Sequence, residues 1–230
     1  MGLPARGLTS AAGRSVRGSS AASRGAAASV AAGSGATGRF DREYYRRFYL
    51  DPRTAVTSPF EARARARLIA AFADLAGVPV GRILDAGCGI GRMRRPLLER
   101  FPRAEYVGLE VSEYLCRRYG WERCGIEEYR STVRFDLVIC YDVLQYLEEA
   151  PAARALANLA EVTRGALYFS ALTLADWRDN CDRRRTDRDV IMRSGEWYRA
   201  RLRRSFREVG AGLWLRRGAP FVLWELERCL

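Results

Sequence analysis

The stretch that most constrains the fold of this chain is RILDAGCGIGR, residues 82–92. The apolar pair Ile83 and Leu84 predicts a buried strand. Three glycines follow at alternate positions: Gly87, Gly89 and Gly91. Glycine takes positive φ freely and lets backbone approach a ligand closely. Because residues 93–101 have a helical pattern, the stretch predicts a strand, a ligand-binding turn and a helix N-terminus, which is half of a βαβ unit.

The spacing of the glycines separates two kinds of nucleotide cofactor. A dinucleotide-binding loop reads GxGxxG, whereas this loop reads GxGxG and has Arg92 where the third glycine would stand. Asp85 precedes the loop, and its carboxylate would repel a pyrophosphate. The sequence therefore disfavours NAD.

The segment DAGCGIG, residues 85–91, resembles motif I of the class I S-adenosylmethionine-dependent methyltransferases. The resemblance covers about residues 60–226 and is most specific at this motif. It implies that the glycine turn holds the methionine end of the cofactor and that a carboxylate serves its ammonium group. The cofactor-binding residues implied here are Asp85, Gly87, Cys88, Gly89 and Gly91.

Two acids after later strands complete the expected cofactor site. YVGLE predicts a strand ending at Glu110, which lies 23 residues after Gly87, near the roughly 20 expected for a ribose-binding carboxylate. A solvated glutamate at the strand end is the alternative. After a third strand predicted at 121–126, Ile126 and Glu127 stand where the family meets adenine through a backbone amide and an acidic or polar side chain. The family usually has Asp there, and a solvated acidic turn is the alternative.

The fourth strand carries the expected reaction centre. FDLVICY, residues 135–141, is a continuous apolar run typical of a strand covered on both faces. Together with the DVLQYL that follows, it resembles motif IV of the small-molecule branch, where the strand end faces the transferring methyl group. The resemblance implies Tyr141 and Asp142 as catalytic candidates and Gln145 as a substrate contact. Because the chain has no histidine, a general base would have to be Asp142, Tyr141, another carboxylate, or none.

Two further segments are candidates for the acceptor side. The N-terminal region of the family often covers cofactor and substrate, so residues 39–57 are expected to form a lid in which Tyr44 and Tyr45 contact the substrate. A helix that packs its aromatic rings on the core is the alternative. Trp177, in the polar stretch 176–193, is another substrate candidate. The alternative there is an exposed loop whose Asp and Arg side chains pair with each other.

Strand and helix patterns alternate along the chain and predict the α/β class. We expect a doubly wound, mostly parallel seven-stranded sheet, the Rossmann-like methyltransferase fold, with a C-terminal antiparallel hairpin from residues 213–215 and 221–226. A helix after Ser58 is expected to bury a stripe of Phe60, Ala64, Leu68, Phe72 and Leu75. A last helix after Ser194 is expected to bury Tyr198, Leu202, Phe206 and Val209.

Residues 1–38 differ in composition from the rest. Alanine, glycine and serine make up 26 of these 38 residues, with four arginines and no acid. Such a segment buries too little apolar surface to repay ordering, so a disordered tail is expected before a domain at 39–230. A mitochondrial transit peptide and a nucleic-acid-binding arm are alternatives to a tail without function. With no secretory segment or membrane span recognised, we expect a cytoplasmic protein.

The formal net charge is +12, and all 39 basic residues are arginine. Such a balance indicates either an anionic partner or an arginine-biased genome. Without an aromatic-interleaved basic stripe, nucleic acid is not favoured. The six cysteines form no CxxC pair, so no metal site is expected. The sequence predicts methyl transfer from S-adenosylmethionine to a small molecule. An RNA or protein methyltransferase and a non-catalytic cofactor-binding module are the alternatives.

Overall fold

The computed structural model describes residues 38–219. The expected tail up to residue 37, the expected strand at 221–226 and Cys229 lie outside the described residues. Among residues 38–219, no helix is both long enough and apolar enough to cross a bilayer.

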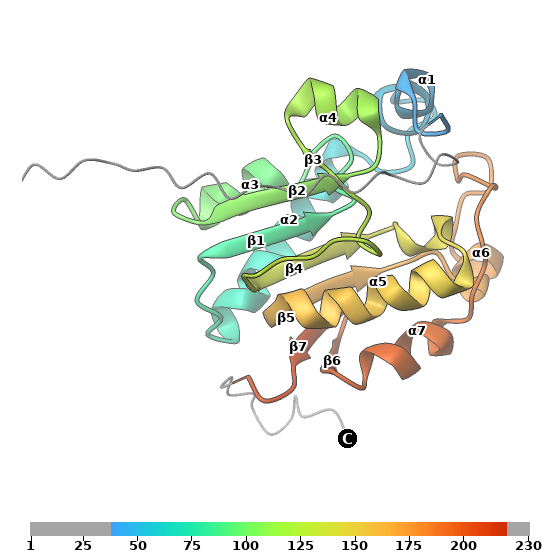
Figure 1. Cartoon of the computed structure of the whole chain (residues 1–230). Coiled ribbons are helices and arrows are strands. Elements are labelled where there is room, and N and C mark those ends of the chain that lie inside the picture. The colour runs from blue at the N-terminus through green and yellow to red at the C-terminus, as the bar shows by residue number, and fades with distance from the viewer. Residues whose placement is uncertain (1–37, 220–230) are drawn as a thin grey trace, which may run out of the picture. The chain divides into compact units, whose positions relative to one another are not determined.

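Within residues 38–219, seven strands form one sheet in the order β3-β2-β1-β4-β5-β7-β6 (Figure 1). The strands are β1 (Arg82–Ala86), β2 (Glu105–Glu110), β3 (Glu122–Arg123), β4 (Phe135–Tyr141), β5 (Thr163–Ser170), β6 (Phe206–Gly210) and β7 (Leu213–Arg216). The pairings among β1 to β5 are parallel, and β7 is antiparallel to both of its neighbours, β5 and β6. The expected fold class, a mostly parallel seven-stranded sheet with an antiparallel C-terminal hairpin, is confirmed.

Helices cover both faces of the sheet (Figure 1). The helices within residues 38–219 are α1 (Arg42–Tyr45), η1 (Arg46–Leu50), α2 (Pro59–Leu75), α3 (Arg94–Arg100), α4 (Glu113–Tyr119), η2 (Leu144–Tyr146), α5 (Glu149–Val162), α6 (Leu174–Asp179) and α7 (Gly195–Leu202). α2 begins in a capping box, because Ser58 Oγ accepts from the Glu61 N–H and the Glu61 carboxylate accepts from the Ser58 N–H. This box fixes the helix that leads into β1.

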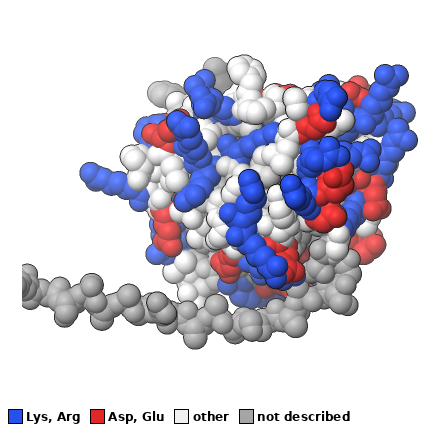
Figure 2. All heavy atoms as spheres, turned by 90° about the horizontal axis from the view of Figure 1, so that it is seen from above, with Lys and Arg blue, Asp and Glu red and all other residues white. Residues whose placement is uncertain are grey.

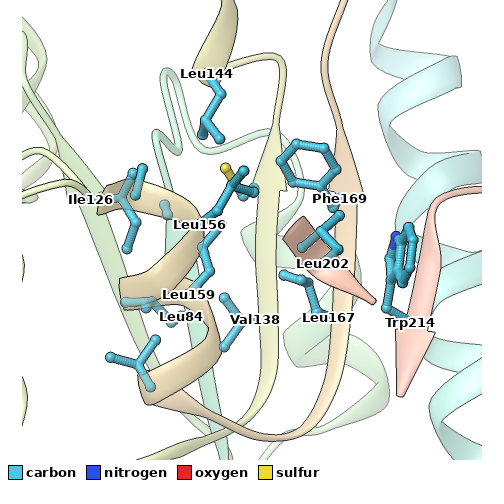
Figure 3. Close-up of a cluster of buried hydrophobic side chains, with 14 of the residues drawn as sticks. Leu84, Ile126, Val138, Leu144, Leu156, Leu159, Leu167, Phe169, Leu202 and Trp214 are labelled. Carbon is cyan, nitrogen blue, oxygen red and sulfur yellow. The ribbon is translucent and has the colours of Figure 1, made fainter. Parts of the chain in front are cut away.

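The core has one hydrophobic cluster on each face of the sheet. On one face α5 and α7 pack on the sheet, with Leu156, Leu159 and Leu202 against Val138 and Leu167 (Figure 3). On the other face the small side chains of α2 and Leu97 of α3 cover the same strands. Both faces of β4 are therefore buried, as the continuous apolar run of this strand predicts.

The stripe expected on α2 is wrong. Phe60, Leu68 and Leu75 are 78%, 45% and 71% exposed, and the helix instead buries its small face: Ala62, Ala66, Ile69, Ala70 and Ala73. The alanines of this face let the helix axis approach the sheet closely around the buried Ile69, whereas Phe60, Leu68 and Leu75 remain exposed. Of the expected stripe, Phe72 packs partly against the core.

The C-terminal elements also differ from their expected bounds. The last helix ends at Leu202, and Phe206 and Val209 belong to strand β6, which forms the hairpin with β7.

The third strand is shorter than residues 121–126, because it pairs with β2 only at Glu122 and Arg123. Trp121 lies outside β3, and its indole N–H donates to the Gly89 carbonyl of the glycine loop.

Candidate functional site

The glycine loop joins β1 to α3 and is held by hydrogen bonds to residues of β2 and to Trp121. The N–H groups of Gly87 and Cys88 both donate to the Leu109 carbonyl of β2, at 2.9 and 3.0 Å. The Trp121 indole N–H donates to the Gly89 carbonyl at 2.9 Å. Gly89 has a φ of +55°, and a Cβ built there would meet nothing within 4 Å. The loop backbone thus faces open space at Gly89, as close approach of a ligand requires.

Asp85 lies near the end of β1, just before the glycine loop. Its side chain is 4% exposed, and its carboxylate accepts a hydrogen bond from the Tyr106 hydroxyl. Burial raises the pKa of Asp85 to about 6, and the Tyr106 bond opposes that rise. A cationic ligand group beside this carboxylate would favour its charged form.

Glu110, at the end of β2, binds the same loop. Its Oε2 accepts from the Gly89 N–H at 2.9 Å, and its Oε1 accepts from the N–H groups of Val111 and Ser112. The Tyr45 hydroxyl also donates to Oε1, at 3.3 Å. Burial raises the pKa of Glu110, and the backbone donors counteract it. Oε2, with one protein donor, keeps acceptor capacity for a ligand hydroxyl.

The segment after β3 is held by a residue that the sequence did not single out. Asn158 of α5 is 5% exposed and donates from Nδ2 to the carbonyls of Ile126 and Glu127, both at 2.9 Å. These bonds fix the backbone of residues 126–127, which follows β3. A polar residue in the middle of the apolar face of α5 was the available signal. Burial raises the pKa of Glu127.

β4 ends in an unusual backbone conformation. Asp142 has a φ of +57°, and its N–H donates to the Ser170 carbonyl at 2.9 Å. A non-glycine residue in this region is uncommon and marks strain or function. Burial raises the pKa of Asp142 to about 6, while the Tyr141 hydroxyl and the Arg65 charge lower it. Arg65 Nη2 donates to the Tyr141 hydroxyl at 3.0 Å.

Residues 39–57 form an aromatic cover for this edge of the sheet. The Tyr44 hydroxyl lies 2.9 Å from that of Tyr146, and the rings of Phe40 and Tyr44 meet edge to face at 5.0 Å. Arg39 pairs with Asp187 at 3.1 Å and so links the cover to the segment after α6. The rings of this segment pack on one another and on Tyr146.

Two cavities lie beneath this cover. Cavity A, of about 230 Å³, is lined by the glycine loop, the end of β4 and the segment 181–190. Cavity B, of about 110 Å³, is lined by Glu110, the segment 124–127 and the residues after β4. Six residues line both: Tyr44, Tyr49, Gly87, Gly89, Asp142 and Tyr146. The two cavities therefore adjoin each other at the glycine loop and Asp142.

The cavities gather most of the residues expected from the sequence. Asp85, Gly87, Cys88, Gly89, Tyr44, Tyr141, Asp142 and Gln145 line cavity A. Glu110, Ile126, Glu127 and Tyr45 line cavity B. Gly91 instead packs on Trp121, and its φ of +72° suits only glycine there. Trp177 lies on α6, outside the lining of both cavities, with Arg183 over its ring at 5.6 Å.

Among the described residues, His, Cys, Asp and Glu form no group of three that could hold a metal ion. The face shown in Figure 2 carries arginines with acids interspersed among them.

Parts of this chain are similar to known proteins. Residues 84–165 match the family model described as "Methyltransferase domain". A curated relative, trans-aconitate 2-methyltransferase of Deinococcus radiodurans, is 33% identical over 94 residues, which are 37% of this chain and 35% of that protein. The chain thus matches about a third of the length of this curated relative.

Solved structures share the fold at low identity. The N-methyltransferase NodS of Bradyrhizobium japonicum, in complex with S-adenosyl-L-homocysteine, has a TM-score of 0.55 at 19% identity, covering 76% of this chain and 97% of that one. DesVI of Streptomyces venezuelae gives 0.54 at 16%, covering 76% and 96%. Magnesium protoporphyrin IX methyltransferase of Synechocystis, with bound S-adenosylmethionine, gives 0.50 at 18%, covering 76% and 90%.

Proposed function

We propose that this chain, whose residues 84–165 carry a methyltransferase domain, transfers the methyl group of S-adenosylmethionine to a small-molecule acceptor. The observation that carries the proposal is the junction of the two cavities at Gly89 and Asp142. One ligand can extend along the glycine loop from cavity B into cavity A. A second ligand can meet it beside Asp142.

The proposed cofactor contacts follow from the charges and open backbone along this path. Asp85 and the loop glycines would hold the methionine end, with Asp85 balancing its ammonium group. Glu110 would accept from the ribose hydroxyls through Oε2. The 126–127 backbone and the Glu127 carboxylate would meet the adenine in cavity B. The open side of Gly89 fits this ligand, since a side chain there would fill the path.

The bound cofactor would supply an activated methyl group on a sulfonium. The protein then has to hold the acceptor in line with the breaking bond and keep water out. The aromatic cover of residues 39–57 and Tyr146 would exclude water above the junction. Asp142, with a pKa of about 6, would be ionised at neutral pH and able to take a proton from the acceptor.

Product formation with different acceptor pools tests this proposal. We would follow S-adenosylhomocysteine release from the full chain with a small-metabolite extract, with total RNA and with a protein extract. We expect release with the metabolite extract, and its loss in Asp142→Asn. Release with RNA or protein alone would contradict the small-molecule assignment. Without release in any pool while cofactor binds, a non-catalytic module would explain the chain better.

A further inference from the structure

We propose that the acceptor is an amine, held as a cation in cavity A against the Asp142 carboxylate and the surrounding tyrosine rings. This inference rests on the proposed function and names the substrate class of the same site. It follows from the charges, the aromatic rings and the shape of the space that cavity A adjoins.

The lining of cavity A is acidic in balance. Among residues 38–219, its charged lining consists of three carboxylates and one guanidinium: Asp85, Asp142, Asp187 and Arg92. The Arg92 guanidinium donates to the backbone carbonyls of Tyr49 and Thr57. Two of its N–H groups thus hold the aromatic cover. An anionic acceptor would meet three carboxylates there and a single guanidinium, part of whose donors are already engaged.

The three carboxylates differ in their hydrogen-bond and ion-pair partners. Asp187 pairs with Arg39 at 3.1 Å, and Asp85 accepts from Tyr106 beneath the glycine loop. The Tyr141 hydroxyl and the Arg65 charge both lower the pKa of Asp142, but Arg65 does not line cavity A. Asp142 lies where the two cavities adjoin each other, so its charge is the one placed beside the proposed site of transfer.

Aromatic rings surround that charge. Five line cavity A: Tyr44, Phe48, Tyr49, Tyr141 and Tyr146. A ring face attracts a cation more strongly when water is excluded. One such contact already exists behind the wall, because the Arg65 guanidinium lies 4.2 Å from the centroid of the Tyr141 ring. A carboxylate with several ring faces is the arrangement that recognises ammonium groups.

Cavity A adjoins a third space that can take the rest of the acceptor. Cavity C, of about 530 Å³, shares the lining residues Tyr49, Val56, Arg92, Cys181 and Thr186 with cavity A. Its own wall combines the apolar side chains of Leu50, Pro52, Ala55 and Pro59 with the polar and charged side chains of Ser58, Glu61, Asn180, Asp182 and Arg185. The body of the amine acceptor can therefore extend into cavity C, against a wall of mixed polarity.

The reaction balances with these groups. The bound ammonium loses one proton to the Asp142 carboxylate, which gives a neutral amine with a free electron pair. That pair forms the new C–N bond as the C–S bond breaks, and the sulfur keeps the electrons of the broken bond. The products are the methylated ammonium and neutral S-adenosylhomocysteine, while the proton on Asp142 leaves to solvent.

Head-group selectivity tests the inference. We would first confirm by calorimetry that S-adenosylhomocysteine binds the full chain, since its failure to bind would contradict the proposed function itself. Benzylamine, benzyl alcohol, benzoate and trans-aconitate would then be titrated into that complex. We expect benzylamine to bind about tenfold or more tightly than the alcohol and the anions. Equal or tighter binding of either anion, or no binding of benzylamine, overturns the inference.

Two variant pairs separate charge from ring. Asp142→Asn should abolish the preference for benzylamine over benzyl alcohol, while Asp179→Asn, at an exposed carboxylate of α6, should keep it. Tyr49→Phe should keep the preference because the ring remains, and Tyr49→Leu should weaken it. A preference that survives Asp142→Asn and Tyr49→Leu unchanged contradicts the assigned recognition.

Discussion

The Tyr45 hydroxyl of α1 donates to Oε1 of Glu110 at the end of β2, across 65 residues of chain and 3.3 Å of space. Glu110 also receives the Gly89 N–H on its other oxygen. One carboxylate thus connects the aromatic cover with the glycine loop. Cover and loop are therefore coupled through a residue that we assign to the cofactor.

Removing the Tyr45 hydroxyl tests this coupling. We expect Tyr45→Phe to lower the free energy of unfolding by about 1 kcal/mol, because one buried hydrogen bond is lost and the ring stays. Urea denaturation measures the change. Tyr119→Phe, at a residue that is 37% exposed, should change it by much less. Equal effects of the two variants would contradict the coupling.

Asp142→Asn should reduce turnover by about a hundredfold or more, because the proposed base is lost. Asparagine tolerates positive φ, so the backbone at the end of β4 should be kept. Cofactor affinity should change only slightly in this variant. Single-turnover transfer and calorimetry measure the two quantities. Unchanged turnover would show that no base acts from this position.

The pH dependence follows from the pKa of about 6 for Asp142. The ionised carboxylate is the proposed base, so turnover should rise as the pH rises through about 6 and level off above it. Burial is the main cause of this raised pKa, the Tyr141 hydroxyl and the Arg65 charge lower it, and the Asp176 charge raises it further. A rate profile of wild type beside Asp142→Asn measures the effect. A rate that falls across this range would contradict the assignment.

Asn158→Leu should weaken S-adenosylhomocysteine binding by about tenfold, because two hydrogen bonds to the 126–127 carbonyls are lost. Asn158 acts through that segment and is a positioning residue. Binding calorimetry measures the loss. Glu161→Gln, an exposed position on the same helix, is the matched control. If both variants bind like wild type, the 126–127 segment does not serve the cofactor.

Asp136→Ala should lower the free energy of unfolding by about 3 kcal/mol. The Asp136 carboxylate is buried and accepts from the N–H groups of Gly81 and Arg82, at 2.9 and 2.8 Å, which would lose their partner. It also pairs with Arg164, which is 56% exposed, so Arg164→Ala should cost well under 1 kcal/mol. Thermal and urea unfolding compare the two variants, and similar losses would contradict this ranking.

Local patterns predicted β1, β2, β4, β5 and the glycine loop because their signals lie within a few residues, whereas the residues of β6 were assigned to the last helix. Each of these patterns is recognised within a short stretch of sequence: the loop glycines, the strand-end acid Glu110 and the apolar run of β4. The buried face of α2 could not be chosen this way. Two stripes share a helical period there, and close packing on the sheet selected Ala66 and Ala70 over Phe60 and Leu68.

The cavities depend on contacts between distant segments, which sequence patterns do not report. Trp121, which was expected in a strand, donates from its indole to the Gly89 carbonyl. Arg92 of the loop donates to the Tyr49 carbonyl. Asp187 lines cavity A and pairs with Arg39, which lies 148 residues away in the sequence. The aromatic composition of residues 40–49 was visible in the sequence, but its place over Asp142 required the fold.

Cofactor binding tests the central claim most directly. We would titrate S-adenosylmethionine and S-adenosylhomocysteine calorimetrically into the full chain, beside Asp85→Asn, Glu110→Gln and the control Glu105→Gln at the exposed start of β2. We expect binding at about micromolar concentration. We also expect the first two variants to weaken binding by about tenfold or more and the control to leave it unchanged. A correctly folded wild-type chain that binds neither compound would contradict the account.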